Sequence, residues 1–370
     1  MFFIVAILSL LYFLLIFSYL IKWNKYSDNF KIKKYQKVSV IIAMRNEEIN
    51  VNNILYDLKN QLYPKELYEV IVVNDHSDDN TLNLLKEFSK KFQNLRIVNM
   101  PEHSQGKKEC IKKGIEISFG NVIITTDADC RIQTQWIEQM AKYFNDSNIN
   151  LVSAPVVFNK KPGLFFKIQE LQFISLIGSG AGAILNNRPI FCNAANMAFR
   201  KSVFLSVSNY FKNQKSVSGD DVFLLHAVKK YFPNTILFAK NKKAIIHTES
   251  QNNLSSFINQ RKRWAAKTTH YKDLDTITVS ILIFIVNLII ILLFFLTLIN
   301  TKYIVLFLMI IIPKSVIDFY FLRSVLNFLN KRELIKYILP FEMFYSFYIT
   351  LMPLIAFTNS FTWKNRKHYH

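Results

Sequence analysis

Long apolar runs lie at both ends of the chain, and shorter apolar runs alternate with polar residues between them. Residues 1–21 carry no charged side chain, and a helix of this length is just long enough to cross a hydrocarbon core of about 30 Å. A cleaved secretory signal would instead have basic residues before its apolar run and a small-residue cleavage site after it. The pattern therefore predicts a transmembrane helix at 1–22.

The residues after this helix are rich in lysine, which predicts the side of the membrane on which they lie. The lysines that follow the apolar run are Lys22, Lys25, Lys31, Lys33, Lys34 and Lys37. Basic residues near a membrane span are retained on the cytoplasmic side. We therefore expect a basic linker at 23–37, a cytoplasmic domain after it, and an N-terminus on the opposite side of the membrane.

The C-terminal part of the chain is apolar again. Its apolar runs are 276–301, 303–322, which contains only Lys314 and Asp318 as charged residues, and 343–363. Three spans here, in addition to the first transmembrane helix, would leave the basic tail at 364–370 outside, against the positive-inside rule. One segment is therefore expected to be interfacial or re-entrant. The prediction is a membrane region at 276–363 with two or three spans.

Between the membrane regions, four apolar runs rich in β-branched residues alternate with helical patterns. These runs are 38–43, 68–74, 95–99 and 121–126. Helices are expected to begin at Thr81 and Thr134, where a polar residue precedes apolar residues at helical spacing. Strands that are apolar throughout and separated by helices indicate a mostly parallel sheet covered on both faces. We therefore expect one α/β domain at 38–275.

The net charge narrows the classes of partner. With 46 Lys and Arg against 26 Asp and Glu, the formal net charge is +20, which favours nucleic acid, anionic lipid or a phosphorylated small molecule. Nucleic acid is the least favoured, because the basic residues border membrane segments and no recognition module is present. Cys110, Cys130 and Cys192 are odd in number and lack Cys-x-x-Cys spacing, which argues against a disulfide framework or a zinc site.

Polar clusters follow the predicted strands, at the sheet edge where ligands bind in open α/β folds. Arg45 and Glu47 follow the first strand, and Asp75 follows the second. Turn formation and helix capping are an alternative explanation for each cluster. A carboxylate at Asp75 could also accept hydrogen bonds from a ring N–H or a ribose hydroxyl.

Asp127 and Asp129 stand two residues apart at the end of the fourth predicted strand. Carboxylate oxygens are preferred ligands of Mg²⁺ and Mn²⁺, which also bind the oxygens of a diphosphate. One carboxylate could ligate the metal while the other contacts a sugar or a second ligand. An isolated Asp-x-Asp can equally be a solvated turn.

Two further clusters lie in the second half of the domain. Asp220 and Asp221 precede an apolar helical run, where a carboxylate either caps the helix or acts as a general base toward an attacking hydroxyl. Gln260, Arg263 and Trp264 lie on a predicted helix shortly before the membrane region. Such a basic helix is either attracted to anionic lipid or presents Arg263 to a phosphate and Trp264 to a sugar ring.

Taken in order, these motifs resemble those of family 2 glycosyltransferases with a glycosyltransferase-A fold. The matching stretches are 38–48, 73–79, 125–130, 218–225 and 260–264. The last resembles the Gln-x-x-Arg-Trp motif of membrane-bound enzymes such as cellulose synthase, hyaluronan synthase and ceramide glucosyltransferase. The resemblance implies an α/β glycosyltransferase-A domain flanked by transmembrane helices, a nucleotide-diphosphate-sugar donor, Mn²⁺ or Mg²⁺, and inverting transfer to a lipid or glycan acceptor.

The resemblance also implies a role for each residue. The donor would contact Arg45, Glu47, Asp75, Lys107 and Asp127, and the metal would bind Asp127 and Asp129. Asp221, beside Asp220, would be the base. The diphosphate and the acceptor would contact Gln260, Arg263 and Trp264. The family more often has Glu-Asp where this chain has Asp220-Asp221, so the choice of base between the two stays open. The apolar segment 165–182 is expected to be either an interfacial helix that guides the acceptor or a core helix.

Two alternatives remain beside an elongating enzyme of the cell envelope. One is transfer of a single sugar to a lipid without elongation, which is compatible with the small number of predicted spans. The other is an inactive scaffold in a polysaccharide-export complex, against which the intact Asp127, Asp129 and Asp221 argue. The sugar, the nucleotide, the acceptor and the linkage are not encoded in a recognisable motif.

Overall fold

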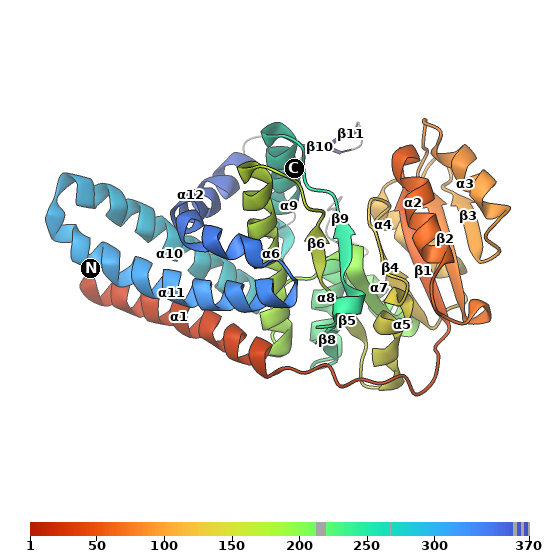
Figure 1. The fold of residues 1–370 in the computed structure, drawn as a ribbon, viewed down its shortest axis with the longest axis horizontal. Helices are drawn as coiled ribbons and strands as arrows, with labels where there is room; N and C mark the ends of the chain where they lie inside the picture. Colours follow the sequence, from red (N-terminus) through yellow and green to blue (C-terminus); the bar gives the residue numbers. More distant parts are fainter. Residues whose placement is uncertain (212–219, 267, 358–360, 364–365, 369–370) are drawn as a thin grey trace.

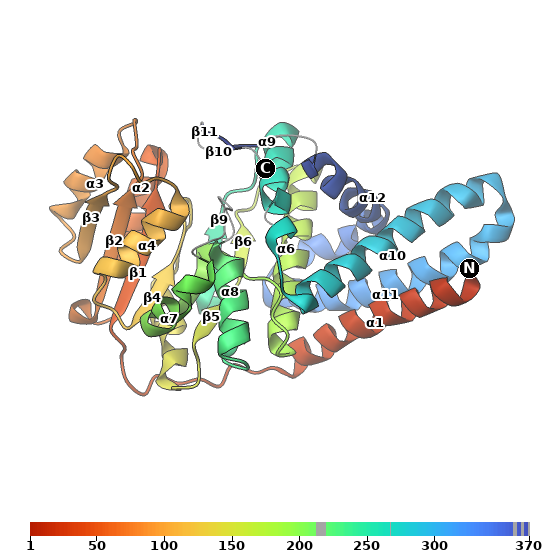
Figure 2. The ribbon, with the colours of Figure 1, turned by 180° about the vertical axis from the view of Figure 1, so that it is seen from behind.

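The structure is a computed structural model that describes residues 1–211, 220–266, 268–357, 361–363 and 366–368. An α/β domain forms one end of the molecule and a bundle of long apolar helices forms the other (Figure 1). The helices α6 (Leu164–Leu185), α9 (Leu254–Ala266) and α12 (Ile338–Phe357) lie between the two parts, as the view from behind also shows (Figure 2).

A seven-stranded sheet forms the centre of the α/β domain. Its strands are β1 (Val38–Met44), β2 (Tyr68–Asn74), β3 (Leu95–Asn99), β4 (Val122–Thr125), β5 (Leu151–Ser153), β7 (Met197–Arg200) and β8 (Ile236–Phe238). Their order is β3-β2-β1-β4-β7-β5-β8, and β7 alone among them runs antiparallel to its neighbours. Two short strands, β6 (Val156–Phe158) and β9 (Ile246–Thr248), pair in parallel beside it. The prediction of a mostly parallel sheet is confirmed, as are the four predicted strands.

Helices cover the sheet and connect its strands. They are α2 (Glu48–Lys59), α3 (Thr81–Ser89), α4 (Lys107–Ile117), α5 (Trp136–Ala141), α7 (Lys201–Phe211) and α8 (Asp220–Tyr231). The helix α9 (Leu254–Ala266) follows β9 and packs against a later helix, α12 (Ile338–Phe357). The helix expected at Thr81 begins there, whereas the one expected at Thr134 begins two residues later because residues 134 and 135 form a turn. All three cysteines are free and buried, in agreement with the predicted lack of a disulfide framework.

Among the residues that the structure describes, four helices are long and apolar enough to cross a membrane by length and composition. They are α1 (Phe2–Lys25), α6 (Leu164–Leu185), α10 (Leu274–Ile299) and the segment Thr301–Phe328, which contains α11 (Ile304–Phe328). In α6, 72% of the most apolar window is buried inside the protein, against 22–28% in the other three. The helix α6 is therefore a core helix, which was one of the two alternatives for 165–182. A further apolar helix, α12 (Ile338–Phe357), packs across α9 and α10.

A buried charge cluster joins three of the apolar helices. Lys314 of α11 is 1% exposed and forms ion pairs with Asp318, at 2.9 Å, and with Glu342 of α12. The hydroxyl of Tyr12 in α1 donates to Asp318 at 2.8 Å. The two charges that interrupt the apolar pattern at 303–322 therefore face the inside of the bundle, where each has a partner of opposite charge.

The segment between α1 and β1 is packed against the domain. The carboxylate of Asp28 accepts hydrogen bonds from Lys142 at 2.7 Å, Tyr143 at 2.8 Å and Asn241 at 3.0 Å. The amine of Lys240 lies 4.6 Å from the ring centre of Trp23 at the end of α1. These contacts hold the end of α1 against the α/β domain.

Candidate active site

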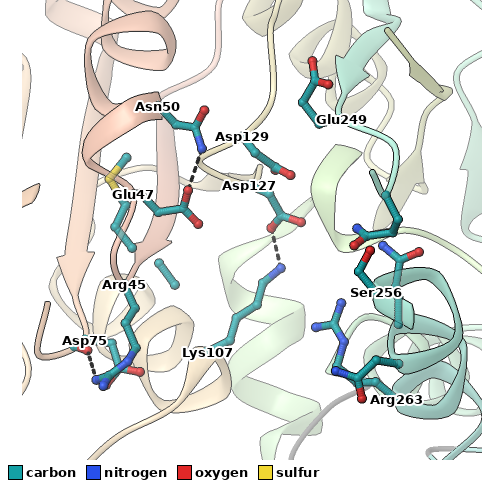
Figure 3. Close-up of a pocket in the computed structure, with 15 residues that line it drawn as sticks. Arg45, Glu47, Asn50, Asp75, Lys107, Asp127, Asp129, Glu249, Ser256 and Arg263 are labelled. Atoms are coloured by element: carbon teal, nitrogen blue, oxygen red, sulfur yellow. Dashed lines mark hydrogen bonds and ion pairs between the residues drawn. The ribbon is translucent and has the colours of Figure 1, made fainter. Parts of the chain in front are cut away.

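A cavity of about 490 Å³ opens at the carboxyl ends of β1, β2 and β4. Because these strands are parallel and adjacent, the polar residues that follow them meet at one edge of the sheet. The predicted site residues that line the cavity are Arg45, Glu47, Asp75, Lys107, Asp127, Asp129, Gln260 and Arg263. Figure 3 shows Arg45, Glu47 and Asp75 on one wall, Ser256 and Arg263 on the opposite wall, and Lys107 and Asp127 between them.

The wall formed by the β1 and β2 loops is held together around Asp75. The guanidinium of Arg45 donates to the carbonyl oxygens of Asp75 at 2.9 Å and His76 at 3.0 Å. The buried Asp75 carboxylate accepts a hydrogen bond from the N–H of Gly106 at 3.1 Å. Gly106 has a φ of 99°, a left-handed conformation that side chains disfavour. Arg45 thus fixes the wall that presents Asp75 to the cavity.

Lys107, the first residue of α4, forms an ion pair with Asp127 in the middle of the cavity (Figure 3). Burial alone would lower the pKa of Lys107, but the carboxylates of Asp127 and Asp221 outweigh it, so the pKa is raised. The lysine therefore keeps its positive charge at neutral pH. Lys107 is one of the residues that the resemblance implies for donor binding, and that role stays a prediction.

Asp129 lies beside Asp127 and is held by the hydroxyl of Thr248, which donates to it at 3.1 Å. Burial and the negative charges of Asp127 and Glu47 raise the pKa of Asp129 to about 6. A cation bound between Asp129 and its acidic neighbours would offset this repulsion and stabilise the charged form of Asp129.

The acidic residues at this point fit a divalent metal that binds together with a substrate. Within the described ranges, no group of three or more His, Cys, Asp or Glu side chains is arranged to hold a metal without other ligands. Mg²⁺ is commonly bound by one or two carboxylates plus the phosphates of a substrate. Asp127 and Asp129 provide two such carboxylates, and the cavity beside them has room for a diphosphate.

The opposite wall belongs to α9. Ser256, Asn259, Gln260 and Arg263 recur at helical spacing and line the cavity. Burial lowers the pKa of Arg263, and the attraction of Asp127, Asp221 and Asp129 opposes this effect. An arginine remains charged under these conditions. Arg263 and Lys107 therefore bring two positive charges to a cavity with five carboxylates, those of Glu47, Asp75, Asp127, Asp129 and Glu249.

Asp221 lies near the cavity, although it is not among its lining residues. Its carboxylate accepts hydrogen bonds from the N–H groups of Val222 at 2.9 Å and Ala194 at 3.2 Å, and its charge acts on Lys107 and Arg263. Ala194 lies just before β7. The side chain of Asp220 lies outside the described part of the structure.

Trp264 lies away from the cavity lining and packs into the protein. Its ring centre is 6.1 Å from that of Phe173 in α6 and 4.1 Å from the guanidinium carbon of Arg261. The Trp264 ring is thus in contact with Phe173 and Arg261 of its own chain. Stacking of this ring on an acceptor sugar stays a prediction.

Several lining residues were missed by sequence reasoning. Glu249 and Gln251 follow β9, a strand of three residues that is too short to give a recognisable pattern. Asn50, Ser256 and Asn259 also line the cavity. The sequence feature that could have indicated Glu249 and Gln251 is the polar run at 248–253, which follows the apolar residues 244–246.

Comparisons of the sequence with known proteins find similarity to glycosyltransferases. The family model described as glycosyl transferase family 2 matches residues 39–207. Glycosyltransferase AglE of Haloferax volcanii is 35% identical over 126 residues, which are 34% of this chain and 41% of that protein. The probable glycosyltransferase YdaM of Bacillus subtilis is 36% identical over 125 residues, which are 33% of this chain and 27% of that protein. The chain thus spans less than half the length of these curated relatives.

A solved structure has a similar fold. The mannosyltransferase PcManGT of Pyrobaculum calidifontis, in complex with GDP-Man and Mn²⁺, superposes with a TM-score of 0.51 and 16% identity. The similarity covers 73% of this chain and 76% of that one. It confirms the predicted fold class.

Proposed function

The chain belongs to glycosyl transferase family 2 through residues 39–207, and on that premise we propose that it moves a sugar from a nucleotide-diphosphate donor to a hydroxyl of a lipid-linked or glycan acceptor. The observation that carries this proposal is the cavity that gathers the Asp127–Asp129 pair, Lys107 and Arg263, with Asp221 nearby. Cations and carboxylates in one cavity suit a diphosphate, a metal and an acceptor hydroxyl together.

The β1–β2 wall would bind the nucleotide. Asp75 is buried at the end of β2 and lines the cavity, where its carboxylate can accept a hydrogen bond from a base N–H. Arg45 keeps this wall in place through its bonds to the backbone at Asp75 and His76. Asp127 and Asp129 would hold Mn²⁺ or Mg²⁺, which neutralises charge on a departing diphosphate.

Two of the basic residues that line the cavity, Lys107 and Arg263, would stabilise the leaving group. In the reaction, the bond between the anomeric carbon and the diphosphate oxygen breaks, and its electron pair leaves with the diphosphate. Lys107 and Arg263 line the same cavity as Asp127 and would lie close to this developing negative charge. Preorganised cations lower the barrier because they need no rearrangement. Arg263 can engage two phosphate oxygens at once.

Asp221 would activate the acceptor. The acceptor oxygen forms its bond to the anomeric carbon on the face opposite the diphosphate, while its proton passes to the Asp221 carboxylate. Attack from the opposite face inverts the configuration at that carbon. The hydrogen bonds from Val222 and Ala194 orient the carboxylate for this step.

The protein would act at a membrane that α1, α10 and α11 cross. These helices lie side by side, with the N-terminus and the α10–α11 turn both at the end far from the sheet (Figure 1). Three spans with the N-terminus outside bring the C-terminus back to the cytoplasm, as the positive-inside rule requires for the basic tail. The helix α12 would then lie at the cytoplasmic interface, as one segment was expected to.

A single-cysteine accessibility experiment tests this topology. Cysteine in place of the exposed Lys90 is expected to react with an impermeant maleimide only after cells are permeabilised, because the α/β domain is cytoplasmic. Lys302→Cys, in the α10–α11 turn, is the matched control and should react in intact cells. The three native cysteines are buried and give little background. Labelling of the Lys90 variant in intact cells would contradict the proposed orientation.

The function itself is tested by incubating purified protein in membranes with a panel of nucleotide sugars and measuring released nucleoside diphosphate. Release that depends on an added acceptor is the expected result. The product length on a lipid or oligosaccharide primer then separates elongation from transfer of one sugar. Absence of release with every donor and acceptor would support the inactive scaffold instead.

A further inference from the structure

The helix α9 has two faces with different roles. Ser256, Asn259, Gln260 and Arg263 line the cavity on one face. Phe257, Arg261 and Trp264 recur at the spacing i, i+4, i+7 and therefore lie on another face of the same helix. Both views show α9 beside α6 and α12 (Figures 1 and 2), with which this second face is in contact.

A charged residue occupies the middle of the packed face. Arg261 is 3% exposed, and its guanidinium carbon lies 4.6 Å from the ring centre of Phe257 and 4.1 Å from that of Trp264. A guanidinium removed from water costs free energy unless its donors are hydrogen-bonded. If its only role were to fill space, an aliphatic side chain would pack there at lower cost.

The two terminal nitrogens of Arg261 donate hydrogen bonds to α6 and to α9 itself, whereas its buried Nε has no hydrogen-bond partner among the described residues. One nitrogen donates to the buried amide oxygen of Gln172 in α6, and another donates to Gln260 of its own helix at 3.2 Å. The hydroxyl of Tyr348 in α12 also interacts with the guanidinium. These directional contacts set both the rotation and the depth of α9, which apolar packing alone would leave less defined.

The segment that leads into α9 is fixed from the same helix. Gln169 of α6 donates to the carbonyl oxygen of Gln251 at 2.9 Å and accepts from the N–H of Gln251 at 3.1 Å. Gln169 and Gln172 lie one helical turn apart on α6. Through them, α6 holds both the segment before α9, at Gln251, and α9 itself, at Arg261.

We infer that Arg261 is a positioning residue that sets the orientation of α9, so that Arg263 projects into the cavity at the level of the donor diphosphate. This inference rests on the proposed function and adds a role for a residue that does not line the cavity. It also links the donor site to α12, because Tyr348 contacts Arg261 while Glu342 of the same helix is paired with Lys314.

A double-mutant cycle with nucleotide binding as readout tests the inference. Wild type, Arg261→Met, Arg263→Met and the double variant, all full-length, are titrated with UDP and GDP and with the matching monophosphates. Arg261→Met is expected to weaken diphosphate binding about tenfold and monophosphate binding less than twofold. In the Arg263→Met background the same change should cost less than twofold, because the arginine that it positions is gone.

Two milder variants keep the test informative if Arg261→Met folds poorly. Arg261→Lys keeps the charge but loses the planar fork, and Tyr348→Phe removes one hydroxyl. Both are expected to show the same diphosphate-selective loss at about threefold, with an unchanged unfolding temperature for Tyr348→Phe. Equal losses in both Arg263 backgrounds, or equal losses for monophosphate and diphosphate, would overturn the inference.

The outcome for the proposed function is read separately. If wild type binds neither nucleoside diphosphate, or if Arg263→Met leaves diphosphate binding unchanged, the proposed donor site is wrong and the positioning role is lost with it. If wild type binds and Arg263→Met weakens binding, while the Arg261 and Arg263 effects are additive, only the positioning role is wrong.

Discussion

Replacement of Asp221 by Asn is expected to lower kcat by about 10²–10⁴-fold while nucleotide affinity stays unchanged. The amide has nearly the shape of the carboxylate but cannot take the proton of an attacking hydroxyl. The carboxylate accepts hydrogen bonds from Val222 and Ala194 through its two oxygens, whereas Asn has one acceptor oxygen. A loss of stability of about 1 kcal/mol is therefore expected as well.

The same substitution at two other aspartates shows whether the loss of turnover is specific to Asp221. Asp220→Asn is expected to have the smaller effect, since it would act through the local field or the acceptor. Asp146→Asn is the matched control distant from the cavity, because an Asn oxygen can still accept the hydrogen bond from the N–H of Asn148. All variants are measured at saturating donor, with nucleotide binding determined by calorimetry. Near-normal turnover in Asp221→Asn would assign the base elsewhere and leave Asp221 a structural role.

Asp127→Asn and Asp129→Asn are each expected to reduce turnover by at least about 10²-fold, because a bound metal contributes several kcal/mol to transition-state stabilisation. Each change removes one charged oxygen ligand while it preserves side-chain shape. Chelation of divalent metal should have the same effect on the wild type, and Mn²⁺ or Mg²⁺ should restore its activity but not that of the variants.

A binding measurement separates metal loss from a damaged fold. UDP and GDP are titrated into each protein with and without Mn²⁺, and the metal should tighten binding of the accepted nucleotide in wild type but much less in the variants. Asp146→Asn again serves as the control, with a response equal to wild type. Full activity of the wild type in excess chelator would refute the metal assignment.

The α/β domain could be predicted from sequence because its signals are local. Each of β1, β2, β3 and β4 is a continuous run of apolar residues, and a strand buried on both faces requires such a run. The polar residues that follow these runs include Asp75 and the Asp127–Asp129 pair. Parallel strands bring their carboxyl ends together, so a motif at each strand end was enough to predict one shared site.

The long apolar helices were predicted on the same basis, since about 20 consecutive apolar residues are a local property. Sequence left open which of two roles 165–182 has, because an interfacial helix and a buried core helix have the same composition. Only contacts with the rest of the chain distinguish them, and 72% burial of the apolar window in α6 identifies a core helix.

The sequence by itself thus determined the α/β class, the apolar helices and most of the residues at the cavity, because periodicity and strand-end position are encoded within short windows. Tertiary structure alone decided which face of α9 meets the cavity, since Arg263 and Trp264 are adjacent in sequence yet lie on different faces. It also brought Glu249 into the wall after the three-residue strand β9 and paired Lys314 with Glu342. These features depend on contacts between residues far apart in the chain, and no local pattern records such contacts.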